Sequence, residues 1–170
     1  MRCRLLLLFA ATFCTAFAAQ ADWQFTKWGM TLDQVLTASK GAVHKVPYDH
    51  GKNVWDIDRG AEGTLSQAGI AYRTEFYFDS RGTLQIVRQT PADLSQCPAV
   101  QKAAEAKYGK PVDTPQFGKS VLISAEYWPD KTAKNAVRYT ATTLMGRYMG
   151  CFLSFVPLEV ADSKGYPHFK

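Results

Sequence analysis

The sequence predicts an α+β domain in which an antiparallel sheet carries two short helices packed on one face. Two stretches, at 31–41 and 95–109, place apolar residues at helical spacing between a capping residue and a glycine. Each is followed by segments of alternating apolar and polar residues separated by turn signals. Because the order helix-then-strands occurs twice, the sequence also suggests a duplicated unit. Whether the two halves share one sheet stays open at this level.

The chain begins with the three parts of a secretory signal. Two arginines supply positive charge, residues 5–17 are mainly apolar, and Ala19-Gln20-Ala21 is a small-x-small pattern that a signal peptidase accepts. We therefore expect a signal peptide over 1–21, cleaved after about Ala21, with Ala18 as the alternative. The apolar stretch is shorter than the roughly 20 residues of a spanning helix, which argues against the alternative of an uncleaved anchor. The mature chain is then expected to be periplasmic or secreted, with no membrane span.

Composition describes the expected mature chain, residues 22–170, as one small domain. Cleavage would leave 18 basic against 15 acidic side chains, a net charge of +3. The basic residues form no run and do not interleave with aromatic residues, so the sequence does not indicate a nucleic-acid partner.

Cysteine usage predicts a disulfide. Cys3 and Cys14 would leave with the signal, and Cys97 and Cys151 would remain. In an oxidising compartment two such cysteines most simply pair. Two free buried thiols and a metal site are the alternatives, but neither cysteine belongs to a C-x-x-C motif and no histidine is close to either in sequence.

The first helix has a clear start. Thr31 and Gln34 form a capping box, and Met30 and Val35 occupy the positions of a hydrophobic staple. Gly41 ends the helix.

The following residues predict strands. Segments 43–46 and 54–57 are expected to be short strands, with a turn at 47–53 and a loop at 60–63. A β-hairpin is predicted from 70–78 and 83–89, because aromatic and β-branched residues alternate there with polar ones around a turn ending in glycine.

The second helix is expected to start with Ser95 as its N-cap and to end at Gly109. One stripe of this helix should face the core: Cys97, Val100, Ala104 and Tyr108.

Three final strands are predicted at 121–128, 136–143 and 149–156. Cys151 shares one face of the last strand with Leu153 and Phe155, so a bridge from the helix to this strand is feasible. The tail from about 157 is expected to be loosely held.

Two patches resemble a known group of proteins. The Trp28-Gly29-Met30-Thr31-x-x-Gln34-Val35 segment resembles the W-G-M-[TS]-x-x-[QE]-V opening of uncharacterised periplasmic proteins of soil bacteria. The Phe76-x-Phe78-Asp79-x-x-Gly82-x-Leu84 hairpin is similar to hairpins of the same chains. The element order also resembles small outer-membrane-assembly lipoproteins and, when doubled, β-lactamase-inhibitor proteins. These resemblances imply the fold and bring no catalytic residues with them.

Candidate chemical motifs are incomplete. Gly118-Lys119-Ser120 lacks the first glycine of a phosphate loop, and Asp56-x-Asp58-x-Gly60-x-Glu62 lacks the third acid of a calcium loop. His44, Asp49, His50 and the distant His168 are the nearest approach to a metal cluster. The sequence has no G-x-S-x-G or Ser-x-x-Lys motif for a nucleophilic serine. Nothing in the pattern indicates a cofactor.

Aromatic residues suggest a possible partner surface. The chain has four tryptophans and eight tyrosines, and most are expected in the core. The surface expected to contact a partner consists of Tyr48, His50, Trp55, Asp56 and Asp58. The sequence therefore predicts a non-enzymatic binding or scaffold module of the bacterial envelope, with a protein partner or inhibitor-like role. A small periplasmic hydrolase acting on an envelope polymer, through paired acids or His44 and His50, is the alternative.

Overall fold

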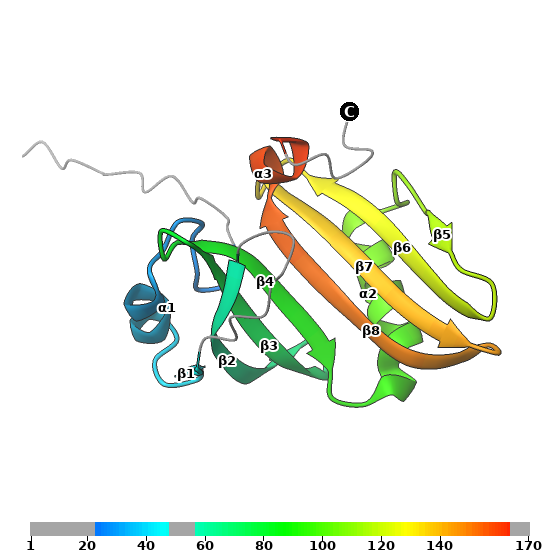
Figure 1. The fold of residues 1–170 in the computed structure, drawn as a ribbon, viewed down its shortest axis with the longest axis horizontal. Coiled ribbons are helices and arrows are strands. Elements are labelled where there is room, and N and C mark those ends of the chain that lie inside the picture. Colours follow the sequence, from blue (N-terminus) through cyan, green and yellow to red (C-terminus); the bar gives the residue numbers. More distant parts are fainter. Residues whose placement is uncertain (1–22, 48–56, 164–170) are drawn as a thin grey trace, which may run out of the picture.

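A computed structural model describes residues 23–47 and 57–163 of the chain (Figure 1). Eight strands form a single antiparallel sheet in the order β1-β2-β3-β4-β8-β7-β6-β5. A few short helices accompany the sheet, so the molecule belongs to the α+β class. No helix among the described residues is long and apolar enough to cross a membrane.

The first half of the sheet follows the first helix. Its elements are α1 (Leu32–Ala38), β1 (His44–Lys45), β2 (Ile57–Gln67), β3 (Ile70–Asp79) and β4 (Leu84–Pro91).

The second half also places a helix before four strands. Its elements are a 3-10 turn η1 (Leu94–Gln96), α2 (Cys97–Tyr108), β5 (Gln116–Phe117), β6 (Val121–Asp130), β7 (Asn135–Leu144), β8 (Arg147–Pro157) and α3 (Leu158–Ser163). The hairpin and the last three strands lie where the sequence predicts them.

The two halves share the sheet through their last strands. β4 pairs with β8, and Val87 opposes Phe155 while Gln89 opposes Leu153. This pairing answers the question that the sequence leaves open, because it places the strands of both halves in one sheet.

The structure corrects the expectation of a loop at residues 60–63. Residues 57–67 form the long strand β2, with a bulge between Arg59 and Ala61. Residues 54–56 of the expected strand and 48–53 of the expected turn lie outside the described residues. Gly63 lies inside β2, and a Cβ atom on it would collide with the backbone carbonyl of Ala42. The glycine is there for the close approach of two backbone segments rather than for a loop.

The N-terminus of α1 is capped as predicted. Thr31 Oγ1 accepts a hydrogen bond from the Gln34 backbone N at 3.4 Å, and Gln34 Oε1 accepts one from the Thr31 backbone N at 2.9 Å. The predicted capping box is therefore confirmed.

The start of the second helix differs from the prediction. Asp93, not Ser95, is the capping residue: its carboxylate accepts hydrogen bonds from the backbone N of Ser95 at 2.8 Å and from the Ser95 hydroxyl at 2.7 Å. It caps η1, and α2 then begins at Cys97. The reason is that Pro98 lacks an N–H, so the chain enters α2 through a 3-10 turn that needs its own cap.

One large core cluster joins both halves of the sheet and contains residues of α1 and α2. Trp23 packs edge-on against Phe76 of β3 at 5.7 Å between ring centroids and also contacts Phe155 of β8 at 6.1 Å. Leu32 and Val35 of α1 belong to this cluster, as does the buried stripe of α2, which is Cys97, Val100 and Ala104. Burial of these apolar side chains is the main source of stability.

The predicted disulfide is present. Cys97 at the start of α2 is bonded to Cys151 of β8, and both residues are buried. The bond fixes α2 onto the second half of the sheet.

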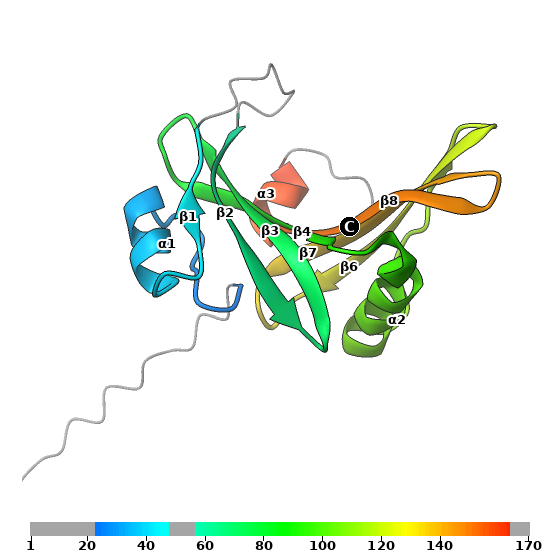
Figure 2. The same ribbon diagram turned by 90° about the horizontal axis from the view of Figure 1, so that it is seen from below.

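The first part of the expected loose tail is a helix, and residues 164–170 lie outside the described residues. Residues 158–163 form α3, whose Ala161 is fully buried in a second small cluster with Ala136 and Val156. These two strand residues are chain neighbours of core residues, so they point to the opposite face of the sheet. Accordingly, α2 and α3 lie on opposite sides of the sheet in Figure 2. Leu158 and Ala161 give α3 an apolar surface to bury.

Candidate functional site

The surface predicted from the sequence is largely outside the described residues. Tyr48, His50, Trp55 and Asp56 fall in the segment 48–56, of which the structure describes nothing. Asp58 is described: it is half-buried in β2, opposite Phe78 of β3. The predicted partner surface, apart from Asp58, therefore lies outside the described residues and stays a prediction.

Of the histidine cluster considered in the sequence, only His44 lies among the described residues. His44 lies on the short strand β1, with Nε2 3.7 Å from Glu62 Oε1. Asp49, His50 and His168 lie outside the described residues. Over residues 23–47 and 57–163, no group of three or more His, Cys, Asp or Glu side chains could hold a metal ion.

The two other incomplete motifs also lie apart from any site. Gly118-Lys119-Ser120 forms the tight turn between β5 and β6, where Gly118 has a φ of +96°. Within the supposed calcium loop, the residues from 57 onward belong to β2 instead.

The described tryptophans are core residues. Trp23 and Trp128 are buried, and Trp28 is partly buried against the same cluster. Trp128 Nε1 donates to the Gly109 carbonyl at 2.8 Å, and Trp28 Nε1 donates to Asn135 Oδ1 at 2.8 Å. These indoles hold elements together and do not form an adhesive surface.

A continuous row of polar side chains crosses the face of the sheet opposite the core. Strand register aligns one apolar residue per strand in the core: Ala61, Phe76, Val87, Phe155, Val137 and Trp128. The residues next to these in the sequence also pair across the strands, and their side chains point to the face of the sheet away from the core. His44 of β1 pairs with Glu62 of β2 and extends this line. We call the line the charged row: His44, Glu62, Glu75, Arg88, Ser154, Arg138 and Tyr127.

Glu75 is the electrostatic centre of the charged row. Its side chain is only 2% exposed, yet Arg88 Nε donates to its Oε2 at 2.8 Å and Arg59 Nη1 donates to its Oε1 at 3.1 Å. Arg73 Nε lies 3.9 Å from Oε1. Burial alone would raise the pKa of Glu75, but the hydrogen bonds and charges of the three arginines outweigh it, so the pKa is lowered.

Glu62 directly opposes Glu75 across β2 and β3, which would be repulsive without a bridging cation. Arg59 supplies that cation, since its Nη1 lies 3.0 Å from Glu62 Oε2 and 3.1 Å from Glu75 Oε1. The bulge at Arg59 directs this side chain onto the charged row.

Aromatic rings hold two arginines of the charged row in place. The Arg88 guanidinium lies 5.0 Å from the ring centroid of Tyr77 and 5.6 Å from that of Phe152. The Arg138 guanidinium lies 5.6 Å from the ring centroid of Tyr127. Burial raises the pKa of Tyr77 to about 12, although the nearby arginines oppose the shift, so its ring stays neutral at physiological pH.

This arrangement is suited to recognition. Arginine and aromatic side chains are the residue types that contribute most at protein–protein interfaces. Stacked guanidinium groups have already lost much of their rotamer freedom, which lowers the entropic cost of binding. Arg88 retains 35% of its side-chain exposure, so it stays accessible to a partner.

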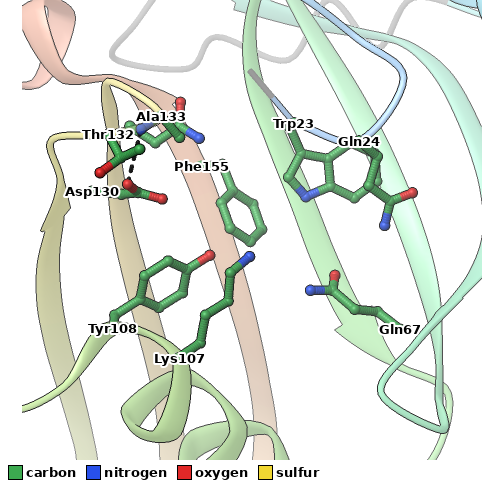
Figure 3. A pocket seen from close by; sticks show the side chains of 10 residues that line it. Trp23, Gln24, Gln67, Lys107, Tyr108, Asp130, Thr132, Ala133 and Phe155 are labelled. Atoms are coloured by element: carbon green, nitrogen blue, oxygen red, sulfur yellow. Dashed lines mark hydrogen bonds between the residues drawn. The ribbon is translucent and has the colours of Figure 1, made fainter. Parts of the chain in front are cut away.

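A separate cavity lies on the core side, at the junction of the two halves (Figure 3). We call it the seam pocket. It has a volume of about 310 Å³. Its lining includes Trp23 and Phe155 as an apolar floor and, around them, Gln24, Gln67, Lys107, Tyr108, Asp130, Thr132, Ala133 and Asn135.

The polar groups of the seam pocket come from both halves of the chain. Lys107 and Tyr108 belong to the last turn of α2, Gln67 to the end of β2, and Asp130 to the end of β6 (Figure 3). Asp130 Oδ1 accepts from the Ala133 backbone N at 2.9 Å, which shapes the β6–β7 turn. Burial raises the pKa of Tyr108, and the Lys107 charge opposes this shift. Asp130 is the one carboxylate in the described lining, so no pair of acids faces this cavity.

The charged row was not predicted from the sequence. The alternation in β3 does indicate that Arg73 and Glu75 share the face away from the core. The partners of Glu75 come from other strands, and only the register shows that they meet.

Comparisons with protein-family models, with curated proteins and with solved structures give no match for this chain.

Proposed function

We propose that the protein is an exported, non-enzymatic binding module of the bacterial envelope and that it binds a protein partner through the charged row. The observation that carries this proposal is the fixed set of arginines on the sheet, with Arg88 held between two rings and Arg138 over a third. Arginine and tyrosine are among the residue types that contribute most of the binding energy at protein interfaces.

The balance of charge on this face favours an acidic partner. Arg88 and Arg138 belong to the charged row and Arg59 and Arg73 lie beside it, whereas Glu62 and Glu75 are its carboxylates. Arg138 Nε is buried and has no hydrogen-bond partner among the described residues. Since Glu75 is already paired with Arg59 and Arg88, the carboxylates of this face do not balance its positive charges. A surface of aspartate and glutamate side chains would complement them.

Export is part of this proposal. The expected signal over residues 1–21 would deliver the chain to an oxidising compartment, and the Cys97–Cys151 bond fits such a compartment.

We also infer that the fold is a duplicated helix-then-strands unit with α1 and α2 on one face. The mirror order of the strands about the β4–β8 pair supports this, as does the presence of both helices in one core cluster. Such a doubled sheet would offer one broad face to a partner.

Quantitative affinity capture from envelope extract tests the binding proposal. The bait is the exported protein, beside a variant carrying Arg88→Ala and Arg138→Ala. The matched control is Arg81→Ala, which removes an arginine that is 79% exposed in the β3–β4 turn, away from the row. We expect one recurrent partner with the wild type and the control and at least a tenfold loss with the double variant. Repeated capture of no partner, or equal capture by all three, would refute the proposal.

The hydrolase alternative keeps one observation in its favour, the seam pocket with Lys107, Tyr108 and Asp130. Its test is hydrolysis of purified envelope polymers by the wild type and by an Asp130→Asn variant. Turnover that Asp130→Asn abolishes would support the alternative, and no turnover would remove it.

A further inference from the structure

Exposed apolar side chains gather at one end of the sheet. Among the described residues, most of the large apolar side chains that face solvent lie in the β5–β8 half, and five of them surround two neighbouring turns. These five are Phe117 (60% exposed), Val121 (46%), Ile123 (40%), Met145 (93%) and Met149 (58%).

Strand register places these residues together. Phe117 of β5 opposes Ile123 of β6, and Val121 of β6 opposes Leu144 of β7, directly before the turn that contains Met145. Figures 1 and 2 both show the β5–β6 turn and the β7–β8 turn side by side at the end of the sheet farthest from α1. We call this region the sheet tip, residues 116–123 and 144–149.

The charge of the sheet tip has one sign. Lys119 lies in one turn, and Arg147 follows the other; both are exposed. The sequence has no aspartate or glutamate over 114–125 or over 131–158. The tip is therefore apolar at its apex and cationic around it.

The shape of the tip distinguishes among possible occupants. It consists of projecting turns, with Met145 almost fully exposed, and is not a groove that would receive a helix or a peptide. A second copy placed on the same surface would bring Lys119 and Arg147 against their own counterparts. An anionic bilayer instead offers phosphates to the cations and an acyl boundary to the apolar side chains.

We propose that the sheet tip docks on the surface of an anionic phospholipid bilayer. Phe117 and Met145 enter the boundary between headgroups and acyl chains, and Lys119 and Arg147 lie among the phosphates. The contact is peripheral, and none of the residues of the charged row belongs to the sheet tip, so the row lies outside the contact. Membrane docking and partner binding thus rest on different residues and can fail separately.

Cosedimentation with vesicles tests this proposal without any protein partner. The exported protein is mixed with vesicles of phosphatidylglycerol and phosphatidylcholine in equal parts, and with vesicles of phosphatidylcholine alone. We expect binding to the anionic vesicles, at least tenfold weaker binding to the neutral ones, and further weakening as salt is raised.

Two variants separate the apolar and cationic contributions. The first carries Phe117→Ser and Met145→Asn; asparagine suits position 145 because its φ is +49°. The second carries Lys119→Glu and Arg147→Glu. Each is expected to lower binding about tenfold or more. The control is Leu94→Ser, which removes an apolar side chain of 40% exposure, the same as Ile123, from η1.

Several outcomes would overturn the proposal. One is absence of binding to anionic vesicles, and another is equal loss in the Leu94→Ser control. A third is a concentration-dependent dimer in sedimentation velocity that Phe117→Ser/Met145→Asn abolishes, because a second copy would then be the occupant. If Phe117→Ser lowers the thermal midpoint, the Met145→Asn single variant, at a solvent-exposed turn, decides the question alone.

Discussion

Removing the disulfide should lower the stability of the fold by a large and calculable amount. The bond joins residues 54 positions apart. In the chain-entropy model a closed loop of that length restricts the unfolded state by about 4 kcal/mol at 25 °C. Replacing both cysteines by alanine avoids a free thiol and an unpaired hydroxyl in the core. The expected loss for Cys97→Ala/Cys151→Ala is therefore about 4 kcal/mol, plus a smaller contribution from lost sulfur contacts.

Urea unfolding followed by tryptophan fluorescence measures this loss, because Trp23 and Trp128 are buried in the core that the bond supports. For a domain of this size the same change corresponds to a fall in Tm of roughly 8 to 16 °C. Reduction of the wild type with dithiothreitol should reproduce most of the effect and should leave the variant unchanged. A loss below about 1 kcal/mol, or an equal response of both proteins to the reductant, would refute the reasoning.

The remaining predictions concern single side chains. Glu75→Gln should lower the free energy of unfolding by about 3 kcal/mol at neutral pH, because the substitution removes the buried carboxylate that pairs with Arg59 and Arg88. Since the pKa of Glu75 is lowered on folding, its contribution is present above the ordinary value of 4.5 and is lost as pH falls further. The free energies of unfolding of wild type and Glu75→Gln, measured by urea titration, should therefore converge in acid. A difference between the two proteins that does not change with pH would contradict this. Thr31→Ala should lower the free energy of unfolding by about 1 kcal/mol, because the helix loses its N-cap. Thr37→Ala, on the exposed side of the same helix, should change the urea midpoint little. Gly63→Ala should lower Tm by several degrees through its collision with the Ala42 carbonyl, and an unchanged Tm would show that the backbone at Ala42 does not approach β2 so closely.

Local features of the fold could be predicted from the sequence. The capping box at Thr31 and the β3–β4 hairpin depend on residues a few positions apart. The Cys97–Cys151 pair follows from two periodicities, since each cysteine lies on the apolar stripe of its own element.

Other features depend on distant contacts. Gly60 and Gly63 look like loop residues in the sequence, but both lie within β2. The glycine at position 63 is explained by the backbone of Ala42, which leaves no room for a Cβ atom there. The β4–β8 pairing joins segments more than sixty residues apart, and no local pattern encodes it.

The candidate site shows the same division. Alternation in β3 could predict that Glu75 faces away from the core, yet a buried carboxylate is not expected from alternation alone. Its burial follows from Arg59 on one neighbouring strand and Arg88 on the other. The register that aligns these three strands is a property of the whole sheet.

Site-specific photocrosslinking inside the living envelope tests the central claim, that the charged row contacts a protein partner. A photoreactive phenylalanine replaces Phe152, which lies against Arg88, or Thr90 two residues farther along β4. Matched positions on the other side of the molecule are Lys102 of α2 and Lys27 before α1, both exposed. The account predicts one crosslinked species from Phe152 and Thr90 and none from Lys102 and Lys27. Crosslinks from the two lysine positions alone would contradict it.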